Sequence, residues 1–321
     1  MVDKRRYRSR KRKRRQRQTL LFVLAVVFVF FGLELLIEWG SGIGAWMGEL
    51  KKPVVKELDL SGINSSYAIL IQARNGKTVG EINADQQMYP ASLTKMMTCL
   101  VAIEELRNLN NEITLTQEMF AGLYEQNATQ AGFQPGETVR VIDLLYGVML
   151  PSGAECCIAL SDTIAGSEEG FVELMNKKAD KLGMKDTHFM NSTGLHDLEH
   201  YSTARDMAIL LKAALKNDTF REIIESPWHS TPSTNIHPDG ITYYSTMFKN
   251  LSDAAVTGGK IMGGKTGYTG EAGHCLASFA EIEDVEYILV TAGASSSSGT
   301  TPHIADAVTV YNRVGEAAQQ Q

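Results

Sequence analysis

The sequence predicts a mixed α/β domain of the α+β type, with one antiparallel sheet flanked by helices and an inserted helical subdomain. Three observations predict it. A strand pair with a tight turn comes early, helical patterns fill the middle, and three apolar strands followed by a helix close the chain. Because strands lie on both sides of the helical block, we expect them to meet in one sheet. With 321 residues, of which 44% are hydrophobic and 21% charged, the composition is that of a globular protein.

The early strand pair has the clearest local signal. The strands expected at 67–73 and 78–82 flank Asn75-Gly76, a dipeptide that favours a tight hairpin turn. After this strand pair, segments with helical apolar spacing and good helix-forming residues predict helices. These lie at 92–106, 141–150, 154–164, 170–182 and 203–216. Three strands are expected at 259–268, 275–282 and 286–292, and a last helix at 302–317.

The first residues differ in character from the rest. Residues 1–18 hold 11 of the 31 Lys and Arg and one acid, so the rest of the chain carries 20 basic and 36 acidic residues. Residues 19–39 are apolar except for two glutamates, which predicts a transmembrane anchor or a signal segment. Because basic residues before an apolar segment stay in the cytoplasm, we expect an extracytoplasmic domain at the membrane and no nucleic-acid partner.

These segments suggest a simple domain plan. A basic cytoplasmic tail at 1–18 and the anchor at 19–39 are followed by a linker at 40–64, rich in Gly, Lys and Pro. The catalytic domain is expected at 65–321. If the apolar segment is cleaved, the protein is secreted instead. The four cysteines lie in apolar or small-residue stretches, and we expect them to be free, buried thiols: Cys99, Cys156, Cys157 and Cys275.

Ser92 and Lys95 form an S-x-x-K pattern at the expected start of the helix at 92–106. Residues three apart share a helix face, and a serine hydroxyl needs a neighbouring base to become a nucleophile. A lysine acts as that base only when it is neutral, which burial and nearby cations favour. Taken alone, the pattern also fits a helix-capping serine with a surface lysine.

Two further triplets carry polar groups suited to a substrate. Lys265, Thr266 and Gly267 lie on an expected strand, where the first two can hold a carboxylate and glycine lets a substrate approach closely. Residues 152–154 (Ser-Gly-Ala) lie between two expected helices. Each triplet also fits an ordinary turn or cap.

Along the chain these motifs follow the order S-x-x-K, S-x-N-like triplet, K-T-G, which is the order of penicillin-binding proteins and serine β-lactamases. The resemblance extends well beyond the motifs. The matching positions are 89–98, Met175, Asn176, Ala179, 182–184, 187–189, Asn191, Gly194, Leu195 and 200–204. From about residue 66 to 294 the chain resembles D-alanyl-D-alanine carboxypeptidases, low-molecular-mass penicillin-binding proteins of the DD-peptidase/β-lactamase superfamily.

The resemblance implies an activity and its catalytic residues. The chain would remove the terminal D-Ala from peptidoglycan stem peptides through an acyl-enzyme on Ser92, and β-lactam antibiotics would acylate the same serine. Lys95 would be the general base, and Ser152 would pass a proton to the leaving D-alanine. The resemblance also implies the fold of the DD-peptidase/β-lactamase superfamily. No cofactor and no metal is expected.

The resemblance also assigns the substrate-binding residues. Lys265 would shape the electric field of the site, and Thr266 would bind the terminal carboxylate. Gly267 would leave room for the substrate, and the Tyr268 backbone N–H would be the second oxyanion donor beside that of Ser92.

Two departures from the family pattern stand out. The third position of the S-x-N triplet is Ala154 instead of asparagine, and residues 293–298 lack an arginine that some relatives use near the carboxylate. Glu155 is the nearest residue that could replace the missing amide. A wall-binding protein with weakened turnover is therefore the alternative function. A β-lactamase is a weaker alternative, because the deacylating glutamate of those enzymes has no recognisable counterpart.

Two other patterns occur by accident. Residues 259–266 fit the phosphate-binding G-x-x-x-x-G-K-T pattern but continue into a poor helix sequence, which argues against ATP binding. Residues 196–200 fit the zinc pattern H-x-x-E-H, but they are expected in a loop instead of on one helix face.

Overall fold

The computed structural model describes residues 54–295 and 301–320. They belong to one compact unit, Pro53–Gln321. The basic tail and the apolar segment predicted at 19–39 lie outside the described residues. Within the described part, no helix has the length and apolar character needed to cross a bilayer.

The compact unit begins earlier than the domain start expected at residue 65. Part of the predicted linker packs into the core, because Val55 and Leu60 are buried against the sheet and the last helix. The Leu58 N–H also bonds to the Val79 carbonyl. Residues 54–64 therefore form an edge of the domain, which the Gly- and Lys-rich composition of the segment did not indicate.

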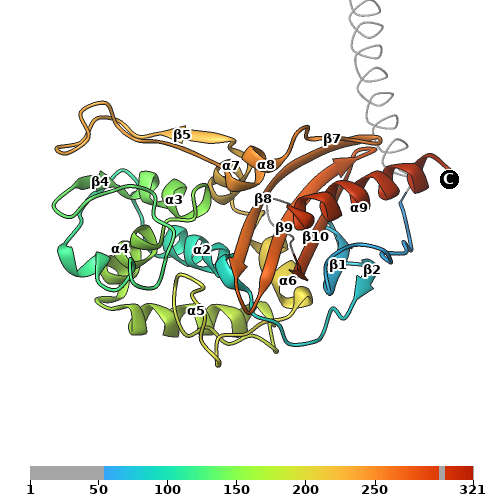
Figure 1. The fold of residues 1–321 in the computed structure, drawn as a ribbon, viewed down its shortest axis with the longest axis horizontal. Helices are drawn as coiled ribbons and strands as arrows, with labels where there is room; N and C mark the ends of the chain where they lie inside the picture. Colours follow the sequence, from blue (N-terminus) through green and yellow to red (C-terminus); the bar gives the residue numbers. More distant parts are fainter. Residues whose placement is uncertain (1–53, 296–300, 321) are drawn as a thin grey trace, which may run out of the picture. The chain divides into compact units, whose positions relative to one another are not determined.

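A six-stranded antiparallel sheet organises the domain (Figure 1). Its order is β2-β1-β10-β9-β8-β7. The strands are β1 (Tyr67–Gln72), β2 (Thr78–Ile82), β7 (Ala255–Val256), β8 (Gly259–Thr269), β9 (Gly273–Ile282) and β10 (Val285–Ala294). The first strand pairs directly with the last, in the register Tyr67↔Ala292. The predicted α+β class, with the helical block inserted into a single sheet, is confirmed.

The predicted hairpin between β1 and β2 is confirmed. Gly76 adopts a left-handed φ of 74°, a conformation that glycine reaches without steric cost. The Asn75 side chain accepts a hydrogen bond of 2.9 Å from the Lys77 N–H. The backbone conformation of Gly76 and the hydrogen bond to Asn75 explain why this dipeptide forms the turn.

Helices cover both faces of the sheet. The long helix α9 (Pro302–Gln319) packs on one face, and the inserted block packs on the other (Figure 1). The block contains η1 (Ala91–Thr94), α2 (Lys95–Glu105), η2 (Gln117–Phe120), α3 (Val141–Met149), α4 (Ala154–Ala165), α5 (Glu168–Leu182), α6 (Ala204–Ala214), α7 (Asp218–Glu225) and α8 (Thr246–Asn250). The predicted helices are confirmed, whereas η2, α7 and α8 were not expected. The four cysteines are free and buried, as predicted.

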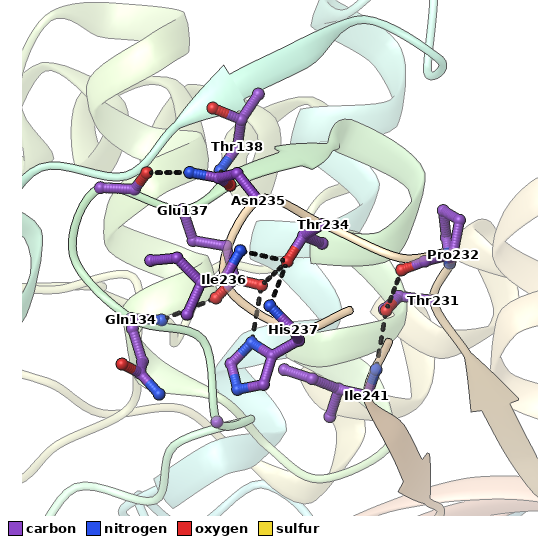
Figure 2. Close-up of polar contacts among 12 residues, drawn as sticks. Gln134, Glu137, Thr138, Thr231, Pro232, Thr234, Asn235, Ile236, His237 and Ile241 are labelled. Carbon is purple, nitrogen blue, oxygen red and sulfur yellow. Dashed lines mark hydrogen bonds and ion pairs between the residues drawn. The ribbon is translucent and has the colours of Figure 1, made fainter. Parts of the chain in front are cut away.

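Two small ribbons in the block were also not expected, β3 (Glu112–Thr114) with β4 (Thr138–Arg140), and β5 (Trp228–Ser230) with β6 (Thr242–Tyr244). Buried Glu137 links them, as Figure 2 shows. Its carboxylate accepts hydrogen bonds from the Thr234 hydroxyl and His237 Nδ1, at 2.6 and 2.8 Å. The loop between β5 and β6 is thereby tied to the segment that precedes α3.

Candidate active site

Ser92 lies in a tight 3₁₀ turn, one turn before the α-helix that was expected to contain it. Ala91, just before it, has a left-handed φ of 46°, which is unusual for a residue with a side chain. Two glycines enclose this turn. A Cβ at Gly194 would lie 2.0 Å from the Ala91 carbonyl oxygen, and one at Gly267 would lie 3.0 Å from the Ser92 nitrogen. Only glycine therefore fits at residue 194, and β8 runs directly past the Ser92 N–H.

Lys95 begins α2 and points back to the serine. Its Nζ donates to the Ser92 hydroxyl at 3.2 Å and to the Thr193 carbonyl at 2.5 Å. The side chain is buried, and burial lowers the pKa of Lys95 below its ordinary value. The S-x-x-K spacing therefore places a base with weakened proton affinity within hydrogen-bond reach of a half-buried hydroxyl.

A second lysine–serine pair adjoins the first. Lys265, fully buried on β8, donates to the Ser152 hydroxyl at 3.0 Å and to the Thr266 carbonyl at 2.8 Å. Burial and then the charge of Lys95 hold the pKa of Lys265 well below its ordinary value. Because the charge of Lys95 lowers the pKa of Lys265, the two lysines lie close together, and both lysine–serine pairs belong to one site.

The loop that carries Ser152 is held in an unusual conformation. Ser152 has a left-handed φ of 73°, which costs a non-glycine residue on the order of 1 kcal/mol. Two backbone hydrogen bonds fix the residues that follow, from the Gly153 N–H to the Gly147 carbonyl and from the Ala154 N–H to the Thr129 carbonyl, both 2.8 Å.

Glu155 does not take the place of the missing asparagine. Its side chain is fully buried, and its Oε1 accepts the N–H groups of Ala131 and Gly132 at 2.6 and 3.0 Å. Its Oε2 has no hydrogen-bond partner among the described residues. Burial raises the pKa of the Glu155 carboxyl group. The carboxyl group therefore joins residues 131–132 to the start of α4 and leaves the Ala154 position without a polar side chain.

The remaining predicted residues lie together at the end of β8. The Thr266 hydroxyl is 2.6 Å from that of Thr246, the first residue of α8. Gly267 lies against the Ser92 turn, and the Tyr268 side chain is 62% exposed. The structure thus brings all seven predicted site residues to one region where β8 meets η1 and the loop before α4.

Two contributors, Thr193 and Thr246, were missed from the sequence, and the role expected for a third was wrong. Thr193 acts through a backbone carbonyl, which carries no residue signature, although the Gly194-Leu195 match pointed to its loop. Thr246 lies in a segment without a periodic pattern. Glu155 was noticed, but for a different role.

The accidental zinc pattern is a loop, as expected. His200 Nδ1 accepts the Met190 N–H at 3.1 Å, so its Nε2 must carry the proton and donate to the Thr94 hydroxyl at 2.8 Å. Both ring nitrogens therefore form hydrogen bonds within the protein, and the one to Thr94 supports the Ser92 turn.

Comparison with known proteins agrees with this geometry. A sequence model of the D-alanyl-D-alanine carboxypeptidase family matches residues 54–296. The chain is 34% identical over 232 residues to the D-alanyl-D-alanine carboxypeptidase DacF of Bacillus subtilis, covering 71% of this chain and 57% of the relative. It is 35% identical over 245 residues to DacC of Escherichia coli, covering 74% and 59%. The chain thus spans less than two thirds of the length of these two relatives.

A solved structure shows the same arrangement of the chain. The crystal structure of the DD-transpeptidase of Streptomyces strain K15 superimposes with a TM-score of 0.70 at 26% identity, covering 81% of this chain and 98% of the other. The family match covers the whole sheet and every motif of the site. The chain belongs to the D-alanyl-D-alanine carboxypeptidase family.

Proposed function

We propose that this chain is a serine D-alanyl-D-alanine carboxypeptidase that removes the terminal D-alanine from peptidoglycan stem peptides. One observation carries the proposal. The Ser92 hydroxyl lies 3.2 Å from the buried amine of Lys95, beside a second buried lysine that donates to Ser152. Burial favours the neutral amine in both lysines, and a neutral amine can accept a proton.

Acylation follows from these contacts. Ser92 Oγ attacks the carbonyl carbon of the penultimate D-alanine while Lys95 Nζ takes the hydroxyl proton. The developing oxyanion accepts hydrogen bonds from the N–H groups of Ser92 and Tyr268. When the tetrahedral intermediate collapses, the C–N bond breaks, and the Ser152 hydroxyl gives its proton to the leaving amine. The proton that Lys95 took from Ser92 then replaces the one that Ser152 gave, so that Lys95 is neutral again, and Lys265, bonded to Ser152, keeps that hydroxyl oriented.

Deacylation reverses these roles with water. A water molecule attacks the ester carbonyl and loses a proton to the neutral amine of Lys95, which passes that proton to Ser92 Oγ as the ester C–O bond breaks. The same serine would open a β-lactam ring and form a slowly hydrolysed ester. The reaction requires no cofactor.

We also propose that the domain lies outside the cytoplasm and is attached to the membrane by residues 19–39. Eleven basic residues in the first 18 precede this apolar run, which favours a cytoplasmic N-terminus. Membrane fractionation and the mass of the mature chain test this, because a cleaved signal would remove the basic tail from that mass and release the protein.

A wall-binding protein with weak turnover is the second candidate. Its support is Ala154, which is buried and cannot offer an amide to the substrate. Losing one hydrogen bond costs about 0.5–1.5 kcal/mol, enough to slow a reaction without removing its nucleophile.

One experiment separates the two candidates. Full-length protein is incubated with a fluorescent penicillin and, separately, with a pentapeptide ending in D-Ala-D-Ala. If the chain is a carboxypeptidase, the penicillin labels it covalently and it releases D-alanine from the pentapeptide. The variant Ser92→Ala is not labelled and releases no D-alanine. Ser252→Ala, at an exposed serine, is the matched control and behaves like the wild type. Labelling without release favours the wall-binding protein, and absence of labelling refutes both.

A further inference from the structure

Thr246 and Thr266 form a contact between two hydroxyl groups that neither motif nor family pattern predicts. Their Oγ1 atoms lie 2.6 Å apart, and the residues come from different elements, α8 and β8. Both side chains are only partly buried. No other described residue forms a hydrogen bond with either hydroxyl.

The hydrogen count of this pair is informative. Each hydroxyl carries one hydrogen and can accept two hydrogen bonds. One hydrogen lies between the two oxygens, whichever group donates it. The second hydrogen remains, and the pair can therefore donate one hydrogen bond to a third group.

The position of the pair identifies that group. Thr266 lies two residues before Tyr268 on β8, which is about 7 Å along an extended strand. One extended residue of about 3.5 Å and one hydrogen bond of about 2.7 Å cover most of that distance. With the scissile carbonyl at the Tyr268 N–H, the carboxylate one residue further on reaches the hydroxyl pair. A carboxylate only accepts hydrogen bonds, which matches the one hydrogen that is left.

The backbone holds Thr246 rigidly in this place. Its N–H bonds to the Leu150 carbonyl at 3.0 Å, just before the loop that carries Ser152. Its carbonyl accepts from Asn250 at 2.7 Å. The residue thus connects the Ser152 loop, α8 and β8.

We propose that Thr246 is a specificity-determining residue, which together with Thr266 selects substrates with a free terminal carboxylate. The inference rests on the proposed carboxypeptidase function and deepens it. If Thr246 donates to Thr266, the hydrogen of Thr266 is free for the carboxylate; if Thr266 donates, that of Thr246 is free. The two residues act as a unit in either case.

The test compares two probes, a blocked L-Lys-D-Ala-D-Ala peptide and the same peptide with a C-terminal amide. Wild-type protein and Thr246→Val are assayed for release of D-alanine or D-alaninamide. Valine keeps the shape and removes the hydroxyl. We expect kcat/KM for the acid to fall ~10-fold or more, as for one hydrogen bond to a charged group. The value for the amide falls by a clearly smaller factor, because a neutral amide gains less from this donor than a carboxylate does.

Three further variants sharpen the test. Thr246→Ser keeps the hydroxyl and retains the preference for the acid. Thr246→Val combined with Thr266→Val falls little below either single change, because the pair acts as a unit. Thr242→Val is the matched control. It removes another hydroxyl contact, 2.5 Å from Ser230 on the adjacent ribbon, and leaves both substrates unaffected.

The outcomes are distinguishable. Equal falls for acid and amide in Thr246→Val, or an unchanged acid preference, overturn the inference while the carboxypeptidase function stands. A wild-type protein that cleaves the amide as readily as the acid also overturns it. No release of D-alanine by wild-type protein instead refutes the proposed function itself. Far-UV circular dichroism and the urea unfolding midpoint show that each variant is folded.

Discussion

The Lys265 amine donates a hydrogen bond of 3.0 Å to the Ser152 hydroxyl, although 113 positions separate the two residues in the chain. The bond joins the sheet to the helical block at the site. It also sets two buried lysines close enough for the charge of one to lower the pKa of the other.

The first prediction concerns the pH dependence of acylation. Lys95 accepts a proton only when neutral, and burial lowers its pKa below the ordinary 10.5. The rate of acylation by a reporter β-lactam should therefore rise with pH, with its half-rise below 10.5. In Lys265→Met the half-rise should stay near the wild-type pH, because Lys265 has the more strongly lowered pKa and is already neutral where Lys95 loses its proton. Lys260→Met, at an exposed position of β8, serves as control and should not move it. A half-rise that moves to higher pH in Lys265→Met would contradict the prediction, because Lys265 would then still be charged where Lys95 loses its proton.

The second prediction concerns stability in acid. Burial lowers the pKa of His200 from 6.5 to about 4, so between these values the unfolded chain binds a proton that the folded chain does not. Stability should fall as the pH drops through this window, by about 3 kcal/mol for this residue near pH 4. His303, also lowered to about 4, acts in the same direction. Urea unfolding at several pH values should show a shallower loss in His200→Gln, and the wild-type slope in the non-titratable control Ser252→Ala. Equal slopes in all three proteins would refute the prediction.

The third prediction restores the missing amide. Ala154→Asn should raise kcat/KM for the pentapeptide about 2- to 10-fold, the value of one hydrogen bond to the substrate. Ala154→Leu has a similar size without an amide and should give no gain. Steady-state release of D-alanine measures both. If leucine and asparagine behave alike, another group supplies the hydrogen bond.

The fourth prediction concerns the buried carboxyl group of Glu155. Glu155→Ala leaves the Ala131 and Gly132 N–H groups without an acceptor, and each lost partner costs about 1–3 kcal/mol. The free energy of unfolding in urea should fall accordingly. Glu155→Gln keeps an acceptor oxygen and should lose less. Glu173→Ala, at an exposed site on α5, should stay within about 0.5 kcal/mol of the wild type. A Glu155→Ala protein as stable as this control would show that residues 131–132 are held by other contacts.

The regular parts of the fold followed from local sequence patterns. The Asn75-Gly76 turn, the apolar strands and the helical spacing each depend on residues close together in the chain, and these elements are confirmed. The short ribbons β3–β4 and β5–β6 depend on distant contacts such as Glu137 with His237, which no local pattern reveals. The same holds for residues 54–64, where Val55 and Leu60 are buried in a cluster with residues of α9.

The candidate site divides in a similar way. The motif residues could be located because their chemistry depends on side-chain type and spacing. Two backbone features could not be located, the left-handed conformation of Ala91 and the carbonyl of Thr193. The type of a side chain does not reveal either one. Thr246 could not be predicted for another reason. Its hydroxyl belongs to the site only through its contact with Thr266, 20 positions later in the chain.

The pairing of β1 with β10 has a consequence for how the molecule forms. Tyr67 finds its neighbour Ala292 only after almost the entire domain has been synthesised. Contacts between residues so distant in the chain slow folding. The chain loses conformational entropy when the large loop closes, and this loss comes before the contact can stabilise the fold. Until then the early hairpin presents an unpaired apolar edge. We therefore expect the newborn chain to depend on protection from aggregation until its last strand arrives.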